Sequence, residues 1–318
     1  MTFPPSQLHV VLGAGQVGPR LIDELLARGL RVRAVRRGAP VMSRTGLEWQ
    51  HGDLRDPTFA REAVRGADVV YNTTNPEAYH RWDELLVPLV RSVREAVALE
   101  HAKLVVLDNL YMVGRPQTTP FDEDAPMHPC SHKGELRKML AEELAIAQAN
   151  GLIATTGRAA DFFGPGAGSM SALGDRLAHQ LATGAPVEVF GDPELPRSYA
   201  FVPDVARGLA VLGTREQSWG AVWHLPVAWQ GSTRGLVEGI AAAYGTKAKL
   251  RRVPDAFLAI AGVFSPMLGA MREMTYQWKA PFVVDDRRFR ATFQVEPTPA
   301  EEALRASAAA LTTMRAAA

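Results

Sequence analysis

The first half of the chain alternates short apolar runs with stretches in which apolar residues recur at helical spacing. Residues 8–12 (LHVVL) form one apolar run, and residues 16–28 carry Val17, Leu21 and Leu25 four apart. This alternation predicts parallel strands joined by right-handed helical crossovers. The predicted strands are 8–12, 32–35, 48–51, 68–73, 104–108 and 153–158, and the predicted helices are 16–28, 57–65, 79–100 and 133–150.

The rhythm loosens after the turn at residues 164–166. A helix near 171–183, strands at 187–190 and 222–225, and mostly helical sequence from Thr233 onward follow. We therefore expect an α/β protein with a doubly wound parallel sheet of the Rossmann type and a smaller, mostly helical C-terminal substrate lobe. The expected domains are a dinucleotide-binding domain over 1–165, to which about 200–228 return, and a substrate-binding lobe over 166–199 and 229–318.

Composition excludes several classes of function. The 318 residues include 47% hydrophobic residues and carry a formal net charge of +1, without the basic footprint of a nucleic-acid or membrane-surface protein. Cys130 is the single cysteine, and no histidine cluster has metal-ligand spacing, so we expect no disulfide framework and no metal.

The termini and the longest apolar stretch bear on localisation. The first residues lack the pattern of a signal peptide, and the apolar stretch 257–274 is interrupted by glycine, proline and charged residues too early to span a membrane. We expect a cytoplasmic protein that acts on a small molecule as a monomer or homodimer, with neither nucleic acid nor a membrane as partner.

A glycine-rich turn directly follows the first predicted strand. Gly13, Gly15 and Gly18, with Gln16 and Val17 between them, lie between strand 8–12 and a helix. The first glycine permits the tight turn, the second allows backbone to approach a pyrophosphate, and the third lets helix pack on strand. The helix N-terminus then faces the phosphates with unpaired N–H groups. This context predicts a dinucleotide site.

The end of the second strand favours one dinucleotide over the other. An NAD-binding protein usually places Asp or Glu there to hold the ribose hydroxyls, whereas this chain has Arg36 and Arg37. A guanidinium matches a 2′-phosphate in charge and geometry, and a carboxylate would repel it. The sequence therefore predicts NADP(H) as cofactor, unless both arginines are simply solvated at the start of a loop.

Several motifs in a fixed order carry a family resemblance. The chain resembles the short-chain dehydrogenase/reductase superfamily in its extended epimerase/dehydratase branch over nearly its whole length. The resemblance implies that Asp53 and Leu54 contact adenine, and that Asn72, Thr73 and Thr74 end against the cofactor's ribose and diphosphate. The segments that carry it are 52–56 (GDLRD), 68–74 (DVVYNTT), 158–166 (RAADFFGPG), 191–204 (GDPELPRSYAFVPD) and 285–290 (DDRRFR).

The departures from that branch fall on the chemistry. Leu12 stands where the branch fingerprint has its first glycine, and Asn109 stands where it has a catalytic Ser or Thr. Lys133 and Arg137 occupy the places of the family's Tyr and Lys. The stretch from Lys133 to Lys138 is similar to the Lys-x-x-Ile-Arg-Arg segment of isoflavone reductase-like proteins, in which the lysine is an acid or base.

These residues suggest an acid–base site. Residues 133 and 137 share a helix face, and a like charge in a dry cleft favours the neutral amine of Lys133. We expect Lys133 as general acid/base, Asn109 as donor to the reacting carbonyl, Arg137 on a ribose hydroxyl, and Tyr111 as a second candidate acid. Alternatively, Lys133 and Arg137 lie on a solvated helix face.

Three further residues are candidates for substrate binding. Asp161 and Phe163 lie in the segment similar to the branch's Arg-x-x-Asn-x-Tyr-Gly-Pro-Gly, and Arg197 lies where nucleotide-sugar enzymes of the branch hold a diphosphate. A surface or interlobe salt bridge is the other interpretation of Arg197. The apolar series between Phe257 and Tyr276 either lines the substrate cleft, which would favour an apolar or aromatic substrate, or packs helices.

The sequence thus predicts an NADPH-dependent reductase of a small, apolar or aromatic organic carbonyl or related electrophile. Two alternatives stay open. One is an epimerase or dehydratase that retains its cofactor. The other is a non-catalytic regulator that senses NADP(H), as the loss of the usual Tyr/Lys pair would allow.

Overall fold

The computed structural model describes residues 7–317, with side chains described as far as residue 312. The chain divides into two compact units. The first comprises Met1–Asp108, Leu136–Arg158 and Val205–Trp223, and the second comprises Asn109–Glu135, Ala159–Asp204 and His224–Ala318. The second unit therefore includes residues 109–135, which carry Asn109, Tyr111 and Lys133. The expected domain boundary at residue 165 stays a prediction.

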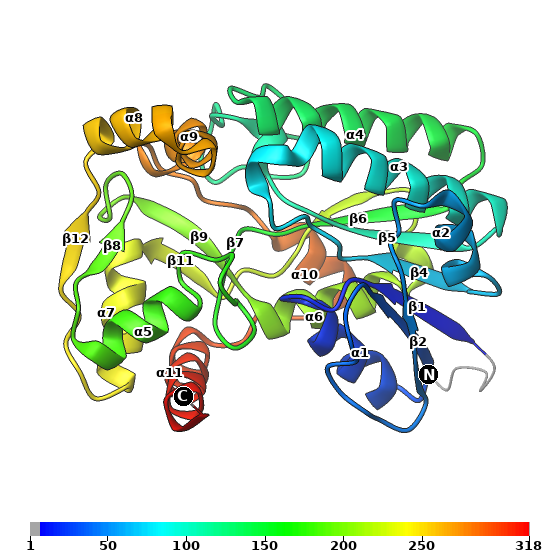
Figure 1. The fold of residues 1–318 in the computed structure, drawn as a ribbon, viewed down its shortest axis with the longest axis horizontal. Coiled ribbons are helices and arrows are strands. Elements are labelled where there is room, and N and C mark those ends of the chain that lie inside the picture. The colour runs from blue at the N-terminus through cyan, green and yellow to red at the C-terminus, as the bar shows by residue number, and fades with distance from the viewer. Residues whose placement is uncertain (1–6, 318) are drawn as a thin grey trace. The chain divides into compact units, whose positions relative to one another are not determined.

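The first unit is built on a seven-stranded parallel sheet in the order β10-β6-β5-β4-β1-β2-β3 (Figure 1). The strand order reverses between β1 and β4, which pair with each other, and ligands of such sheets bind at that switch point beyond the carboxyl ends of the strands. The strands are β1 (Leu8–Leu12), β2 (Arg31–Arg36), β3 (Leu47–His51), β4 (Val69–Asn72), β5 (Lys103–Asp108), β6 (Ala154–Arg158) and β10 (Val222–His224).

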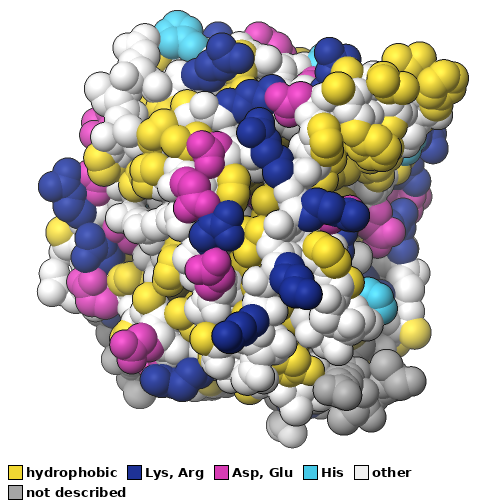
Figure 2. Space-filling model, turned by 90° about the vertical axis from the view of Figure 1, so that its left-hand side faces the viewer, with side chains coloured by type: hydrophobic (Ala, Val, Ile, Leu, Met, Phe, Trp, Pro, Cys, Tyr) yellow, Lys and Arg dark blue, Asp and Glu magenta, His cyan; other side chains and the backbone are white. Residues whose placement is uncertain are grey.

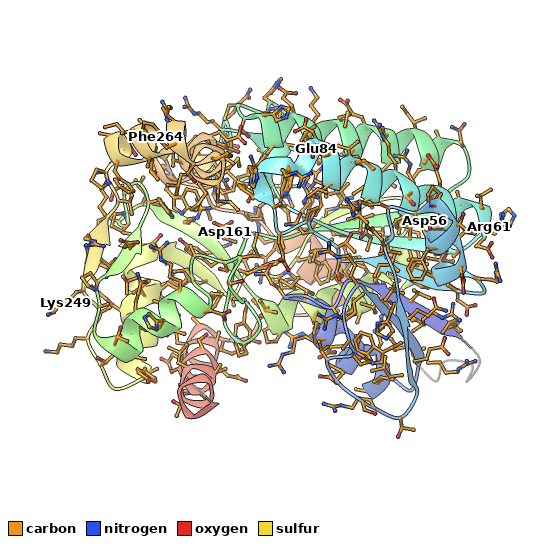
Figure 3. All side chains as sticks on the ribbon, in the orientation of Figure 1. Asp56, Arg61, Glu84, Asp161, Lys249 and Phe264 are labelled. Carbon is orange, nitrogen blue, oxygen red and sulfur yellow. The ribbon has the colours of Figure 1, made fainter. Side chains whose placement is uncertain are left out.

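Helices cover both faces of this sheet. In Figure 1, α2, α3 and α4 lie on one face and α1 and α6 on the other. The start of α2 is specified by neighbouring residues. Asp56, labelled in Figure 3, is the N-cap, and its carboxylate accepts a hydrogen bond from the Thr58 N–H at 2.9 Å, while Pro57 occupies the first position of the helix. The helices are α1 (Gly18–Ala27), α2 (Pro57–Val64), α3 (Trp82–Leu99), α4 (His132–Ala149) and α6 (Val202–Leu212), with short 3-10 turns η1 (Tyr79–Arg81) and η3 (Glu216–Ser218).

The second unit has two small sheets, ordered β11-β9-β7 and β12-β8. Its core joins strands to α5, α7 and α11 through buried residues such as Phe163, Leu236 and Ala303. Its strands are β7 (Asp161–Phe163), β8 (Val187–Val189), β9 (Pro196–Phe201), β11 (Trp229–Ser232) and β12 (Leu250–Arg252). Its helices are α5 (Asp175–Thr183), α7 (Thr233–Ala243), α8 (Asp255–Phe264), α9 (Pro266–Glu273), α10 (Arg287–Phe293) and α11 (Ala300–Ala317), with 3-10 turns η2 (Tyr111–Val113) and η4 (Met274–Trp278).

The doubly wound parallel sheet expected from the sequence is confirmed, and so is a helix-rich C-terminal region. Four strands were missed, β7, β9, β11 and β12, because runs of three to six residues without clear alternation carry little period-two signal. The helix expected from residue 171 begins only at Asp175. The apolar stretch 257–274 forms two short helices, and among residues 7–317 no helix is long and apolar enough to cross a bilayer.

Candidate functional site

The turn between β1 and α1 can close only around glycine. Gly13 has φ +95°, in the region that side chains rarely adopt, and its N–H donates to the carbonyl of Val35 at 2.9 Å. A Cβ on Gly18 would lie 2.0 Å from the Gly13 carbonyl oxygen. A Cβ on Gly15, in contrast, would meet nothing within 4 Å. The middle glycine therefore leaves open space above the turn.

The N-terminus of α1 is shaped to receive an anion. Val17 stands at the N-cap and its side chain makes no capping hydrogen bond, and the first turn contains no acidic residue. The N–H groups at this end and the positive end of the helix dipole are therefore available to a ligand phosphate. The half-buried Gln16 lies in the same turn.

The end of β4 is fastened to this turn. The Thr73 hydroxyl donates to the carbonyls of Leu12 at 2.9 Å and Gly13 at 3.0 Å. The Asn72 side-chain oxygen accepts from the hydroxyl of Thr74 at 2.6 Å. The structure thus brings Asn72, Thr73 and Thr74 together with the glycine turn, at the switch point of the sheet.

Two arginines follow β2. Among the residues that the structure describes, the Arg36 guanidinium makes no ion pair or hydrogen bond. Arg37 acts electrostatically on Asp53, but the main partner of that carboxylate is Arg55, which binds it at 2.5–3.0 Å and lowers the pKa of Asp53. Leu54, next to it, is buried. The expected contact of Asp53 and Leu54 with adenine stays a prediction.

The residues of the first unit fit a dinucleotide. The glycine turn, the uncapped helix end, the open space over Gly15 and the unpartnered Arg36 are all features that a bound pyrophosphate and a phosphorylated ribose would use. In the part of the chain with described side chains, no three His, Cys, Asp or Glu residues are grouped so as to hold a metal ion.

In the second unit, Lys133 lies at the start of α4 and is buried, with 4% of the residue exposed. Its ammonium forms an ion pair with Glu273 at the end of α9, and the other oxygen of that carboxylate accepts the backbone N–H of His132 at 2.9 Å. The solvated-face interpretation of Lys133 is therefore wrong. The Glu273 carboxylate thus fixes the position of the Lys133 amine.

Asn109 and Tyr111 belong to the same neighbourhood. The Asn109 side-chain oxygen accepts the Tyr111 N–H at 3.0 Å, which shapes the turn η2. A Cβ on Gly134 would lie 2.6 Å from the Tyr111 carbonyl oxygen, so this turn packs directly against the start of α4 next to Lys133. The Tyr276 hydroxyl donates to the same carbonyl at 3.5 Å.

Tyr276 and Glu273 are residues that sequence reasoning missed. Both line a cavity of about 420 Å³, together with Cys130, Arg115 and Arg272. Burial raises the pKa of the Tyr276 phenol, so it stays protonated at neutral pH. No local signal identifies them, because Glu273 follows Lys133 by 140 residues and Tyr276 sits in an apolar run that resembles helix packing.

Arg137 belongs to the first unit, and both of its terminal guanidinium nitrogens have partners there. Its guanidinium donates to Asp108 and to the side-chain oxygen of Asn75, each at 3.0 Å, and stacks over Trp82 at 4.6 Å. The guanidinium's charge is thus balanced by Asp108, which weakens the expected effect of Arg137 on the amine of Lys133. Its contact with a ribose hydroxyl stays a prediction.

The three candidate substrate residues lie in the second unit. Arg197 is buried and donates to Asp161 at 2.5 Å and to the backbone carbonyl of Gln277 at 2.5 Å, while stacking on Trp278 at 4.5 Å. Figure 3 labels Asp161, which comes from β7. Phe163 is 1% exposed. Arg197 and Asp161 thus form a salt bridge inside the second unit, and substrate contacts stay predictions.

The chain matches one family model and is similar to two known proteins over different shares of its length. The model of the NAD dependent epimerase/dehydratase family matches residues 9–222. The chain is similar to the uncharacterized protein y4nG of Sinorhizobium fredii, 24% identical over 265 residues, and the match covers 81% of this chain but only 65% of that protein. It is also similar to sterol demethylase protein B of Methylococcus capsulatus, 44% identical over 68 residues, which is 20% of this chain and 21% of that protein.

Among solved structures, the fold is similar to that of DesIV, the dTDP-glucose 4,6-dehydratase of Streptomyces venezuelae, with NAD bound. The TM-score is 0.78 with 17% sequence identity, and the match covers 98% of each chain. At that identity the likeness concerns the fold.

Proposed function

Because the chain belongs to the NAD dependent epimerase/dehydratase family, we propose that it is an NADPH-dependent reductase of a small, apolar or aromatic carbonyl compound or related electrophile. The observation that carries this proposal is the amine of Lys133, which is buried and paired with Glu273. The resemblance described above puts this lysine at the place of the family's usual tyrosine. A buried acid with an available proton suits the protonation that follows reduction of a carbonyl.

Each residue of the site has its own role in the proposed reduction. NADPH, when bound at the glycine turn, supplies the hydride. Lys133 donates a proton to the oxygen that becomes negative, and Glu273 orients the amine beforehand. The amide of Asn109 lies at the adjacent turn as a hydrogen-bond donor to the same oxygen, and Tyr111 stands beside it as a second donor.

Two observations support the choice of cofactor and substrate class. Arg36 has no ionic partner among the described residues and is free to bind a 2′-phosphate. A relative that shares 44% identity over a short segment is named for sterol demethylation, so its name points to an apolar compound. For Lys133 the expected contribution of a general acid is a factor of about 10²–10⁴ in rate.

The test compares two lysines of one helix. Lys133→Met should lower kcat against a panel of apolar and aromatic ketones and aldehydes by at least about 100-fold, with the Kd for NADPH unchanged. Lys138→Met, which removes a half-buried lysine five residues further along α4, should turn over like the wild type. Equal activity of Lys133→Met and wild type would remove Lys133 from the mechanism.

A second candidate is an epimerase or dehydratase that retains its cofactor, favoured by the family and by the likeness to a dehydratase. Such an enzyme would hold NAD(H) tightly through purification and change a nucleotide sugar without net consumption of NADPH. Stoichiometric NADPH binding with no oxidation across the whole panel would instead indicate a regulator that senses NADP(H).

A further inference from the structure

Helix α8 exposes large apolar side chains to solvent. Phe257, Ile260, Val263 and Phe264 are 56%, 67%, 77% and 84% exposed. We call these four residues the α8 apolar face. Figure 2 shows hydrophobic side chains gathered at the upper right, where α8 lies, and Figure 3 labels Phe264 at the end of that helix. A contiguous exposed patch of this kind marks a site of interaction with another surface.

The geometry of the helix makes these four residues one surface. Residues 257, 260 and 264 are spaced i, i+3, i+7, so they follow one face of α8, and 263 adjoins 264. Leu258, on the opposite side, is 2% exposed and lines the cavity described above. The helix therefore has one side that packs into the second unit and another that faces solvent.

The α8 apolar face is held in place by the next helix. A Cβ on Gly262 would lie 3.1 Å from the Cα of Gly269, so α8 and α9 pack backbone to backbone. The Ser265 hydroxyl accepts from the Leu268 N–H at the start of α9 and fixes the turn between them. The apolar side chains thus project from a closely packed helical hairpin.

Basic residues occur in the hairpin and in the strand that precedes it. Between residues 245 and 280 the chain has six Lys and Arg residues and two acidic residues, although the whole chain has a net charge of only +1. Asp255 pairs with Lys279, and Glu273 pairs with Lys133. Among the described residues, two basic side chains next to the hairpin make no ion pair: Arg252, which ends β12 just before α8, and Arg272 of α9. Lys249 lies away from Phe264 (Figure 3).

From this juxtaposition we propose that the α8 apolar face docks on the surface of a lipid bilayer that contains anionic lipids. Apolar side chains inserted at the headgroup boundary and basic side chains beside them are the two contributions that hold a peripheral helix on such a surface. A helix of 10 residues is about 15 Å long and cannot cross a hydrocarbon core of about 30 Å, so α8 lies in the interface.

The same charges argue against a second copy of this chain as the occupant. A two-fold contact between identical α8 faces would bring the unpaired Arg252 and Arg272 of both copies closer together. An anionic bilayer offers the opposite charge over its whole surface.

The experiment measures co-sedimentation of the full chain with vesicles. Vesicles of phosphatidylcholine with phosphatidylserine should bind the protein at low salt, and vesicles of phosphatidylcholine alone should bind it at least about tenfold more weakly, as should the anionic vesicles at high salt. Replacing Phe257→Ser and Phe264→Ser together should weaken binding to anionic vesicles about tenfold or more, because two exposed phenyl rings lose their burial in the interface.

A matched control removes equally exposed apolar residues elsewhere. Leu99 and Ile146, 59% and 62% exposed in the first unit, replaced together by serine, should leave vesicle binding unchanged. Thermal melting should be equal for both double variants, which shows that the fold is intact. No binding to anionic vesicles, equal binding by the two double variants, or a dimer in light scattering that Phe257→Ser and Phe264→Ser dissociate would each overturn the proposal.

Discussion

Replacing Gly18 by alanine tests the steric requirement of the turn between β1 and α1, and also its proposed role in binding NADPH. The added Cβ would lie 2.0 Å from the Gly13 carbonyl oxygen, whereas real Cβ contacts essentially never come below 3.0 Å. The neighbour is backbone and cannot rotate away, so α1 and the end of β1 must separate by about 1 Å. Overpacking of this kind costs about 1–3 kcal/mol, and a rigid backbone partner puts Gly18→Ala near the upper end.

The expected result is measured without and with cofactor. A loss of about 3 kcal/mol lowers the Tm of a unit of this size by roughly 6–12 °C. Gly18→Ala should show this drop in a thermal melt without cofactor, and its Kd for NADPH should rise as well, because the N–H groups of α1 lose their alignment with the phosphates.

Gly15→Ala is the matched control, since its Cβ would meet nothing within 4 Å in the protein. It should melt like the wild type and yet bind NADPH about tenfold more weakly or worse, because the methyl group occupies the space through which the pyrophosphate approaches. If Gly18→Ala melts within about 2 °C of the wild type, the steric argument is wrong. If Gly15→Ala binds NADPH normally, the pyrophosphate does not lie over this turn.

The remaining predictions concern charge. Arg36→Ala should raise the Kd for NADPH roughly tenfold to hundredfold and leave the Kd for NADH unchanged, because one charged hydrogen-bonding partner of the 2′-phosphate is lost. Calorimetric titration of both cofactors measures this, and an equal effect on the two Kd values would refute the assignment of Arg36 to the 2′-phosphate. Glu273→Gln should lower kcat, and it should lower the free energy of unfolding in urea by about 2 kcal/mol, because the amine of Lys133 stays buried without its carboxylate partner. Unchanged kcat and stability would contradict the role of the pair. Burial lowers the pKa of His9 from 6.5 to about 4, and its ring nitrogen is 3.0 Å from the hydroxyl of the buried Tyr71. Below pH 6.5 the unfolded chain takes up a proton that the folded chain refuses until about pH 4, so stability should fall through that window by up to about 3 kcal/mol. In urea unfolding at pH 7 and pH 4.5, His9→Gln should show a smaller loss than the wild type, and an equal loss would exclude His9 as the cause.

Much of the first unit could be predicted because its signals are local. A run such as residues 8–12 is buried on both faces of a parallel sheet, and each of its residues is at most 7% exposed, so four of its five residues are apolar and the strand is easily recognised. The spacing of Gly13 and Gly18 encodes a turn that closes over five residues. Signals of this range are complete within a few residues of sequence, and they were sufficient to predict the parallel sheet and the glycine turn that follows β1.

Only part of the candidate catalytic site could be recognised from the sequence. Lys133 stands out because it replaces an expected tyrosine, but its partner Glu273 lies 140 residues away and only folding brings the two together. Arg137 shares a helix with Lys133, and the spacing led us to expect that the two charges influence each other. The structure instead gives Arg137 a carboxylate of its own, Asp108, contributed by β5.

The sequence by itself thus determined the parallel sheet, the glycine turn at its switch point and the unusual lysine, because hydrophobic period, glycine spacing and residue identity are local properties. Only the tertiary structure decided which charges are paired and which apolar residues are covered. The stretch from Phe257 to Phe264 looked like packing or a substrate cleft, and the charges near it are too scattered to form a block. Folding leaves its outer side uncovered, because burial depends on what packs against a helix and not on the helix's own residues.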